Sequence, residues 1–173
     1  MDGSDQRGCS DSRISGTHVN PGVSGSTPHN SRRIALIPVV PGDAHGTLSV
    51  SAVPLSFWGG FDPASGKVMD VHHDLCGQSL AGRVLVMPFS RGSSSSSGVL
   101  LESIRLRTCP AAIITQTAEP ILAIASIIAR ELYGRWVPVA TVSKDDMALL
   151  QNGCAVDVRI SHDAGEMLIQ EGT

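Results

Sequence analysis

Charge imbalance and long apolar runs are both missing from this sequence, and each absence excludes a class of partner. The 13 Lys and Arg residues nearly offset the 16 Asp and Glu residues, giving a net charge of −3. No strongly basic surface is therefore expected for nucleic acid or an anionic membrane. The longest apolar run, at residues 121–129, is far shorter than the ~20 residues of a membrane-spanning helix. We expect neither a nucleic-acid nor a membrane partner.

Metal-binding cysteine motifs are also missing. The four cysteines, Cys9, Cys76, Cys109 and Cys154, form no C-x-x-C pair and have no Cys/His finger spacing. We predict free thiols in a reducing compartment and no metal ligands in this chain. Cys76 lies in a loop pattern, HHDLCGQ, where an incidental thiol and a ligand are both open interpretations.

The first part of the chain is rich in Gly, Ser, Asp and Asn and has almost no aliphatic residues. Such a composition cannot build a core, so we predict a flexible N-terminal tail at 1–31 and one folded domain at 32–173. The tail lacks the apolar stretch of a secretory signal. Its acidic residues Asp2, Asp5 and Asp11 are atypical of a mitochondrial transit peptide. We expect a cytoplasmic protein.

The folded part alternates strand-like and helix-like segments. Short aliphatic and β-branched runs predict strands, and apolar stretches bounded by Ser, Pro or Gly predict helices. The helix at 120–133 is apolar on most faces, which predicts that it is sandwiched between other elements. The result is an α/β domain with parallel strands, of the compact β/β/α kind. Strands are predicted at 32–40, 47–55, 82–88, 111–115, 137–142, 155–160 and 166–170, a structured loop at 59–67, and helices from within the serine run, at 120–133 and at 144–152.

The sequence RGSSSSSG, residues 91–98, lies between an apolar strand pattern and an apolar helix pattern. A flexible Gly/Ser linker would join two domains, and no second domain is expected here. Helix capping explains one or two of the serines. However, Arg91 and Gly92 followed by hydroxyls and free amides at a helix start make a ready anion site. The run lacks the lysine of a Walker A loop and the spacing of a G-x-S-x-G elbow, so we predict binding of a phosphate or carboxylate.

Two further groups of residues allow a structural and a functional interpretation. The aromatic pair Phe57 and Trp58 could belong to the core, but aromatics make up only 3% of the chain, and one beside a glycine pair can anchor a partner. His72 and His73 stand in no recognisable triad order, and we predict that they lie in a solvated loop.

Four motifs occur in the same order as in a known family. They are GG-x-D-P-x-x-G at 59–66, G-Q-S-L-A-G at 77–82, G-S-S-S-S-S-G at 92–98 and E-L-Y-G at 131–134. On these motifs the stretch from Arg33 to Val142 resembles the small, swivelling domain of aconitase X. The resemblance implies the swivelling β/β/α fold of the aconitase superfamily.

The resemblance also implies which residues act. In this superfamily an iron–sulfur cluster held by cysteines of the large subunit is the Lewis acid, and the swivelling domain supplies a serine that removes a proton. The matching serine, the first after the glycine, is Ser93. Arg91, Gly92, Ser94 and Ser95 are then implied to bind the substrate.

A second implied segment is the loop that carries Gly59, Gly60 and Asp62. The resemblance implies that it faces the active-site cleft or the large subunit, while its composition alone is equally that of a turn.

The implied function is that of the small subunit of a two-component aconitase X hydro-lyase. The implied substrate is cis-3-hydroxy-L-proline, a small carboxylate, and the product Δ1-pyrroline-2-carboxylate. Mevalonate 5-phosphate is the alternative substrate within the family, and a stand-alone anion-binding module without catalysis is the alternative of another class. The implied partner is the large subunit, which holds the iron–sulfur cluster, and no cofactor is expected on this chain alone.

Overall fold

The computed structural model describes residues 31–170. The tail predicted at 1–31 lies outside the described residues, apart from Ser31, which begins the first strand. Within the described part of the chain, no helix has both the length and the apolar character needed to span a membrane.

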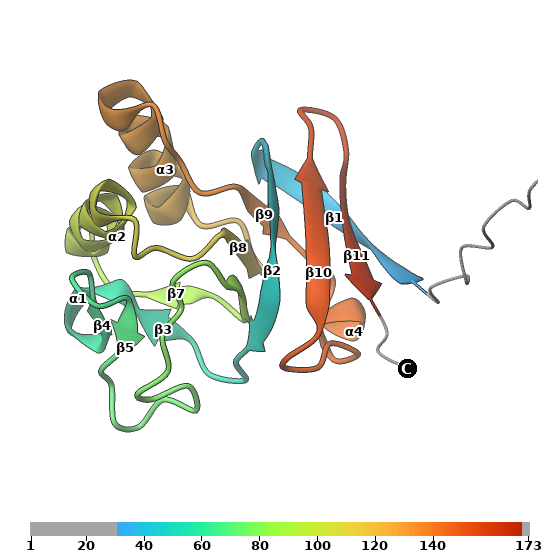
Figure 1. Ribbon diagram of the computed structural model, residues 1–173, viewed down its shortest axis with the longest axis horizontal. Helices are drawn as coiled ribbons and strands as arrows, with labels where there is room; N and C mark the ends of the chain where they lie inside the picture. The colour runs from blue at the N-terminus through green and yellow to red at the C-terminus, as the bar shows by residue number, and fades with distance from the viewer. Residues whose placement is uncertain (1–30, 171–173) are drawn as a thin grey trace, which may run out of the picture.

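Seven strands close into a barrel (Figure 1). Half of it is antiparallel: β1 pairs with β11, β11 with β10, and β10 with β2. The other half is parallel, from β2 through β6 and β8 to β9, and an antiparallel pairing of β9 with β1 closes the ring. In barrel order the strands are β1 (Ser31–Val40), β11 (Gly165–Gln170), β10 (Ala155–Ile160), β2 (Gly42–Val50), β6 (Val84–Met87), β8 (Ala112–Thr115) and β9 (Val139–Thr141).

The parallel strands separate two hydrophobic cores. Successive side chains of a strand point to opposite faces, so Val84 and Val86 of β6 enter the barrel core. Leu85 and Met87 enter a second core beneath the helices α2 (Ser95–Leu106) and α3 (Pro120–Tyr133). Both faces of β6 are therefore buried, which explains its uninterrupted apolar sequence.

Helix α3 begins and ends as the sequence predicts, but its predicted burial on all sides is wrong. Pro120 lies in its first turn and Gly134 ends it in the left-handed conformation. Its packed face is built of Leu122 and small residues, and the contact covers only that side because the helix lies at the surface beside α2 (Figure 1). The opposite face is exposed and apolar, comprising Ile124, Ile127, Ile128 and Leu132.

The segment after β2 differs from the prediction. The strand predicted at 47–55 is divided, because β2 runs from Gly42 only to Val50 and a separate strand β3 covers Leu55–Ser56. The residues between them turn away from the barrel to hydrogen-bond with a distant loop. This divergence carries the chain from the barrel to the second core, above which the serine run lies.

The structured loop predicted at 59–67 contains the end of α1 (Phe57–Gly60), β4 (Phe61–Asp62), a turn and the start of β5 (Lys67–Val68). The other short elements are β7 (Ser90–Arg91) and α4 (Lys144–Met147). Ser143 caps α4, since its hydroxyl accepts a hydrogen bond from the Asp146 amide at 3.0 Å. The helix ends at Met147 instead of continuing to 152.

Candidate functional site

The serine run leads from strand β7 into helix α2, so the helix starts inside the run as the sequence predicts. Ser93, Ser94 and Ser95 are exposed, whereas Ser96 is completely buried. The first three hydroxyls therefore face solvent at the amino end of a twelve-residue helix, where the helix dipole favours negative charge.

The start of helix α2 leaves polar groups free. The N-cap Ser94 makes no side-chain capping hydrogen bond, and the Ser93 hydroxyl accepts only a long one, 3.4 Å, from the Ser95 amide. Within residues 31–170, the amides of Ser93 and Ser94 have no hydrogen-bond acceptor. Two amide donors and three hydroxyls are thus available to an anion.

The run is held against the segment that contains the glycine pair. Strand β3 pairs in parallel with β7, which sets Ser56 beside Arg91. The Trp58 amide donates to the buried Ser96 hydroxyl at 3.4 Å. The structure therefore brings the residues around Gly59 and Gly60 next to the serine run.

Gly92 is the residue that this close approach requires. Its φ is +121°, a backbone conformation that side chains rarely permit. A Cβ at this position would lie 2.5 Å from Ser96 Oγ and 3.2 Å from Ser56 Oγ. A larger residue would push the serine run away from the neighbouring segment.

Arg91 makes an ion pair that the sequence does not suggest. Its Nη2 lies 3.3 Å from Oδ2 of Asp70, and the arginine side chain remains 52% exposed. Asp70 lies close to Gly60, whose carbonyl accepts its amide at 3.4 Å. Arg91, Asp70 and the glycine pair thus surround the start of the serine run.

Asp62 has a different environment from Gly59 and Gly60. Its carboxylate accepts hydrogen bonds from the Ser65 hydroxyl and from the Ala64 and Ser65 amides. The Ser65 hydroxyl, followed by the Ala64 amide, lowers the pKa of Asp62. The turn packs at the opposite end of α2, where Pro63 accepts a hydrogen bond from the Thr108 hydroxyl. Asp62 therefore fixes its own turn.

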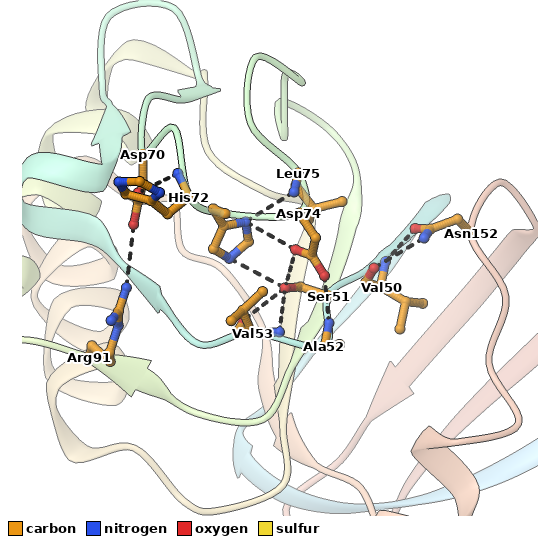
Figure 2. Close-up of polar contacts among 11 residues, drawn as sticks. Val50, Ser51, Ala52, Val53, Asp70, His72, Asp74, Leu75, Arg91 and Asn152 are labelled. Atoms are coloured by element: carbon orange, nitrogen blue, oxygen red, sulfur yellow. Dashed lines mark hydrogen bonds and ion pairs between the residues drawn. The ribbon is translucent and has the colours of Figure 1, made fainter.

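A Ser–His–Asp group with a buried serine and a buried histidine lies between the barrel and the site (Figure 2). The Ser51 hydroxyl donates to Asp74 at 2.6 Å and lies 3.3 Å from His73 Nε2, and both Ser51 and His73 are buried. The Leu75 amide donates to His73 Nδ1 at 3.1 Å. Both ring nitrogens of His73 therefore contact polar groups of the protein.

This arrangement is structural and is not a catalytic triad. The serine of a catalytic triad donates its hydroxyl proton to the histidine, whereas the Ser51 hydroxyl donates to Asp74. His73 Nδ1 also lies 3.2 Å from Asp74 Oδ1. The prediction of a solvated histidine pair holds for His72, which is exposed, and is wrong for His73.

The cysteines do not form a cluster site among the described residues. Cys76 is exposed, Cys109 and Cys154 are partly buried, and burial raises the pKa of the Cys109 thiol. Across residues 31–170, no three His, Cys, Asp or Glu side chains come together as metal ligands. Because iron–sulfur clusters are held by several cysteine thiolates, the described residues do not fit such a cluster.

Comparison with known proteins identifies the family. The family model for the aconitase X swivel domain matches residues 33–169. The structure is similar to that of Thermococcus kodakaraensis aconitase X, with a TM-score of 0.71 and 37% identity, covering 81% of this chain and 99% of that one. The chain belongs to the aconitase X swivel domain family, and its α/β fold is the one that the motifs predict.

Two kinds of named relatives occur. The cis-3-hydroxy-L-proline dehydratase of Pseudomonas aeruginosa is 46% identical over 112 residues, which is 64% of this chain and 19% of that protein. The phosphomevalonate dehydratase small subunit of Thermococcus gammatolerans is 40% identical over 134 residues, 78% of this chain and 95% of that protein. The chain thus spans about a fifth of the length of the first relative and almost the whole of the second.

Proposed function

We propose that this chain is the small subunit of a two-component aconitase X hydro-lyase that dehydrates cis-3-hydroxy-L-proline to Δ1-pyrroline-2-carboxylate. The observation that carries the proposal is the exposed serine run at the start of α2, with Arg91 directly before it. The 46% identity to a cis-3-hydroxy-L-proline dehydratase favours this substrate.

In the proposed reaction Ser93 is the base. Its hydroxyl oxygen, as the alkoxide, takes the proton from the carbon that bears the substrate carboxylate. The electron pair left behind forms the carbon–carbon double bond, and hydroxide leaves from the neighbouring carbon, so that one water is lost in total. The resulting enamine tautomerises to the product. A serine is a weak base in water, so the amides of the helix start are needed to stabilise the alkoxide.

Substrate binding is assigned to the other groups of the run. Arg91 offers a planar set of donors suited to a carboxylate. The free amide and hydroxyl of Ser94 and the exposed Ser95 hydroxyl supply further donors, and Gly92 lets the backbone approach closely. Gly59 and Gly60 border the same space. The Asp62 carboxylate is hydrogen-bonded within its own turn. We therefore assign Asp62 no contact with the substrate, and propose only that its loop faces the partner.

We propose that the partner is a large aconitase X chain, which also holds the iron–sulfur cluster. The name of the Thermococcus gammatolerans relative, a small subunit, supports a two-chain assembly. Large apolar side chains exposed beside the serine site support docking there: Trp58 (64%), Met69 (55%), Val71 (74%) and Phe89 (43%). Patches of this kind mark interaction surfaces, and tryptophan is a frequent hot spot.

Trp58 offers a direct test of this docking surface. Trp58→Ala should weaken association with the large chain by about 2 kcal/mol or more, roughly thirtyfold in Kd, as for a buried aromatic hot spot. Ile37→Ala removes an equally exposed side chain from the barrel strand β1 and should leave Kd unchanged. Both values come from titration of the large chain by calorimetry. Equal Kd values for the two variants would place the partner elsewhere.

Mevalonate 5-phosphate is the second candidate substrate. The observation in its favour is that the phosphomevalonate dehydratase small subunit of Thermococcus gammatolerans matches this chain over nearly its whole length. A phosphate would use the same free amides and Arg91. A stand-alone anion-binding module is the alternative without catalysis.

The substrate is tested by competition. The two-chain complex, purified anaerobically, is given cis-3-hydroxy-L-proline and mevalonate 5-phosphate, singly and together. We expect pyrroline carboxylate from the first and a much lower kcat/KM for the second. A higher kcat/KM for mevalonate 5-phosphate would make it the preferred candidate substrate. Binding of both compounds without turnover of either would favour the anion-binding module.

A further inference from the structure

Asp70 connects the serine site to the rest of the molecule. One carboxylate oxygen, Oδ1, accepts the His72 amide at 2.9 Å, and the other, Oδ2, contacts Arg91 Nη2 at 3.3 Å (Figure 2). Its side chain is 23% exposed, against 52% for that of Arg91. Asp70 is therefore the more confined partner of the pair, and Arg91 is the one whose orientation it sets.

The loop that carries Asp70 is fastened to the barrel. The His73 amide donates to the Asp70 carbonyl at 3.1 Å, and the His73 ring is buried against Ser51. Asp74, on the same loop, accepts from the Ser51 hydroxyl and, at 2.7 Å, from the Ala52 amide. These contacts join the loop to the end of β2, so the backbone of Asp70 has a fixed position relative to the barrel.

A free arginine side chain has many rotamers, and ordering it on binding costs free energy. An arginine already paired with a fixed carboxylate has lost part of that freedom. The pair uses one terminal nitrogen, and the remaining donors of the guanidinium stay available. The Arg91 side chain is thus pre-organised in the ligand-free protein.

We propose that Asp70 is a positioning residue that orients Arg91 at the entrance to the serine run to receive the substrate carboxylate. This inference rests on the proposed function. Because Arg91 binds the carboxylate in the ground state and in the transition state alike, loss of its orientation should raise KM and leave kcat nearly unchanged. Loss of the base Ser93 would instead lower kcat.

The test is Asp70→Asn in the assembled two-chain enzyme. The His72 amide and Arg91 bind different oxygens of Asp70. In asparagine one of these oxygens is replaced by an NH₂ group, which cannot accept a hydrogen bond, so one of the two contacts is lost. We expect KM to rise about three- to tenfold, the cost of ordering one long side chain, with kcat within about twofold. The matched control is Glu102→Gln, which breaks an arginine pair within helix α2, Glu102 with Arg105 at 2.7 Å, and should leave KM unchanged.

A second readout uses the full chain alone and no activity. The ¹⁵N relaxation of the Arg91 Nε–Hε group should report a restricted side chain in the wild type and a mobile one in Asp70→Asn. An Arg91 group equally mobile in both proteins, or an unchanged KM in the variant, would overturn the proposal. An assembled enzyme that turns over neither substrate would refute the proposed function instead, while the relaxation experiment would still decide the role of Asp70.

Discussion

Replacing Ser93 with alanine separates catalysis from folding more cleanly than any other change in the site. The side chain is exposed, and its only hydrogen bond within residues 31–170 is the 3.4 Å contact from the Ser95 amide. Losing so long a bond should cost less than the ~1 kcal/mol typical of a capping serine. Losing a positioned base should lower kcat by about 10²–10⁴-fold. The variant is therefore expected to fold, assemble and bind substrate, and to turn over very slowly.

The assay is pyrroline carboxylate formation by the two-chain enzyme, with urea unfolding of the small chain measured in parallel. Ser97→Ala is the matched control, since Ser97 belongs to the same run but its hydroxyl donates to the Ser94 carbonyl. The control should keep nearly full kcat. A Ser93→Ala enzyme with more than a tenth of the wild-type kcat would refute the base assignment, and a large loss in Ser94→Ala alone would shift the role by one residue.

Two further pairs of variants test the packing that positions the site. Gly92→Ala should lower the free energy of unfolding by about 1–3 kcal/mol, because residue 92 has a positive φ and a Cβ there would collide with the Ser96 hydroxyl. Gly98 lies inside helix α2, and a Cβ there would meet open space. Gly98→Ala should therefore raise the free energy of unfolding by up to about 1 kcal/mol. Equal changes in the free energy of unfolding for the two glycine variants, measured in urea, would contradict the close packing of Gly92 against Ser96. His73→Leu should cost about 1–3 kcal/mol, because the buried Leu75 amide loses its partner and Ser51 loses one of its contacts. His72→Leu, at an exposed position, should cost less than about 0.5 kcal/mol. A similar loss in both histidine variants would refute the different burial of the two side chains.

The local patterns of the sequence predict most elements correctly. The uninterrupted apolar runs of β6 and β8 indicate strands buried on both faces, and both are sandwiched between the barrel core and the helices. The limits of α3 follow from Pro120 and Gly134. The burial of α3 was mispredicted because an apolar sequence favours burial but does not say what buries it. The described part of the chain packs against only one face of the helix.

The prediction of an anion site at the serine run could be made from the sequence because all of the residues it uses are contiguous. Asp70 and the Ser51–His73–Asp74 group were not, because their partners are about twenty residues apart and meet only when β2 diverges toward β3. Ser51 lay inside a predicted strand, and His73 resembles its exposed neighbour. No periodicity distinguishes a buried polar residue from a solvated one before the chain has folded.

The most direct test of the account is complementation between the two chains. The large aconitase X chain encoded in the same genome is purified anaerobically with and without this chain, and cis-3-hydroxy-L-proline dehydration is followed for each chain alone and for the mixture. We expect turnover in the mixture only. Turnover by the large chain alone, at the rate of the mixture, would contradict the claim that this domain supplies the base.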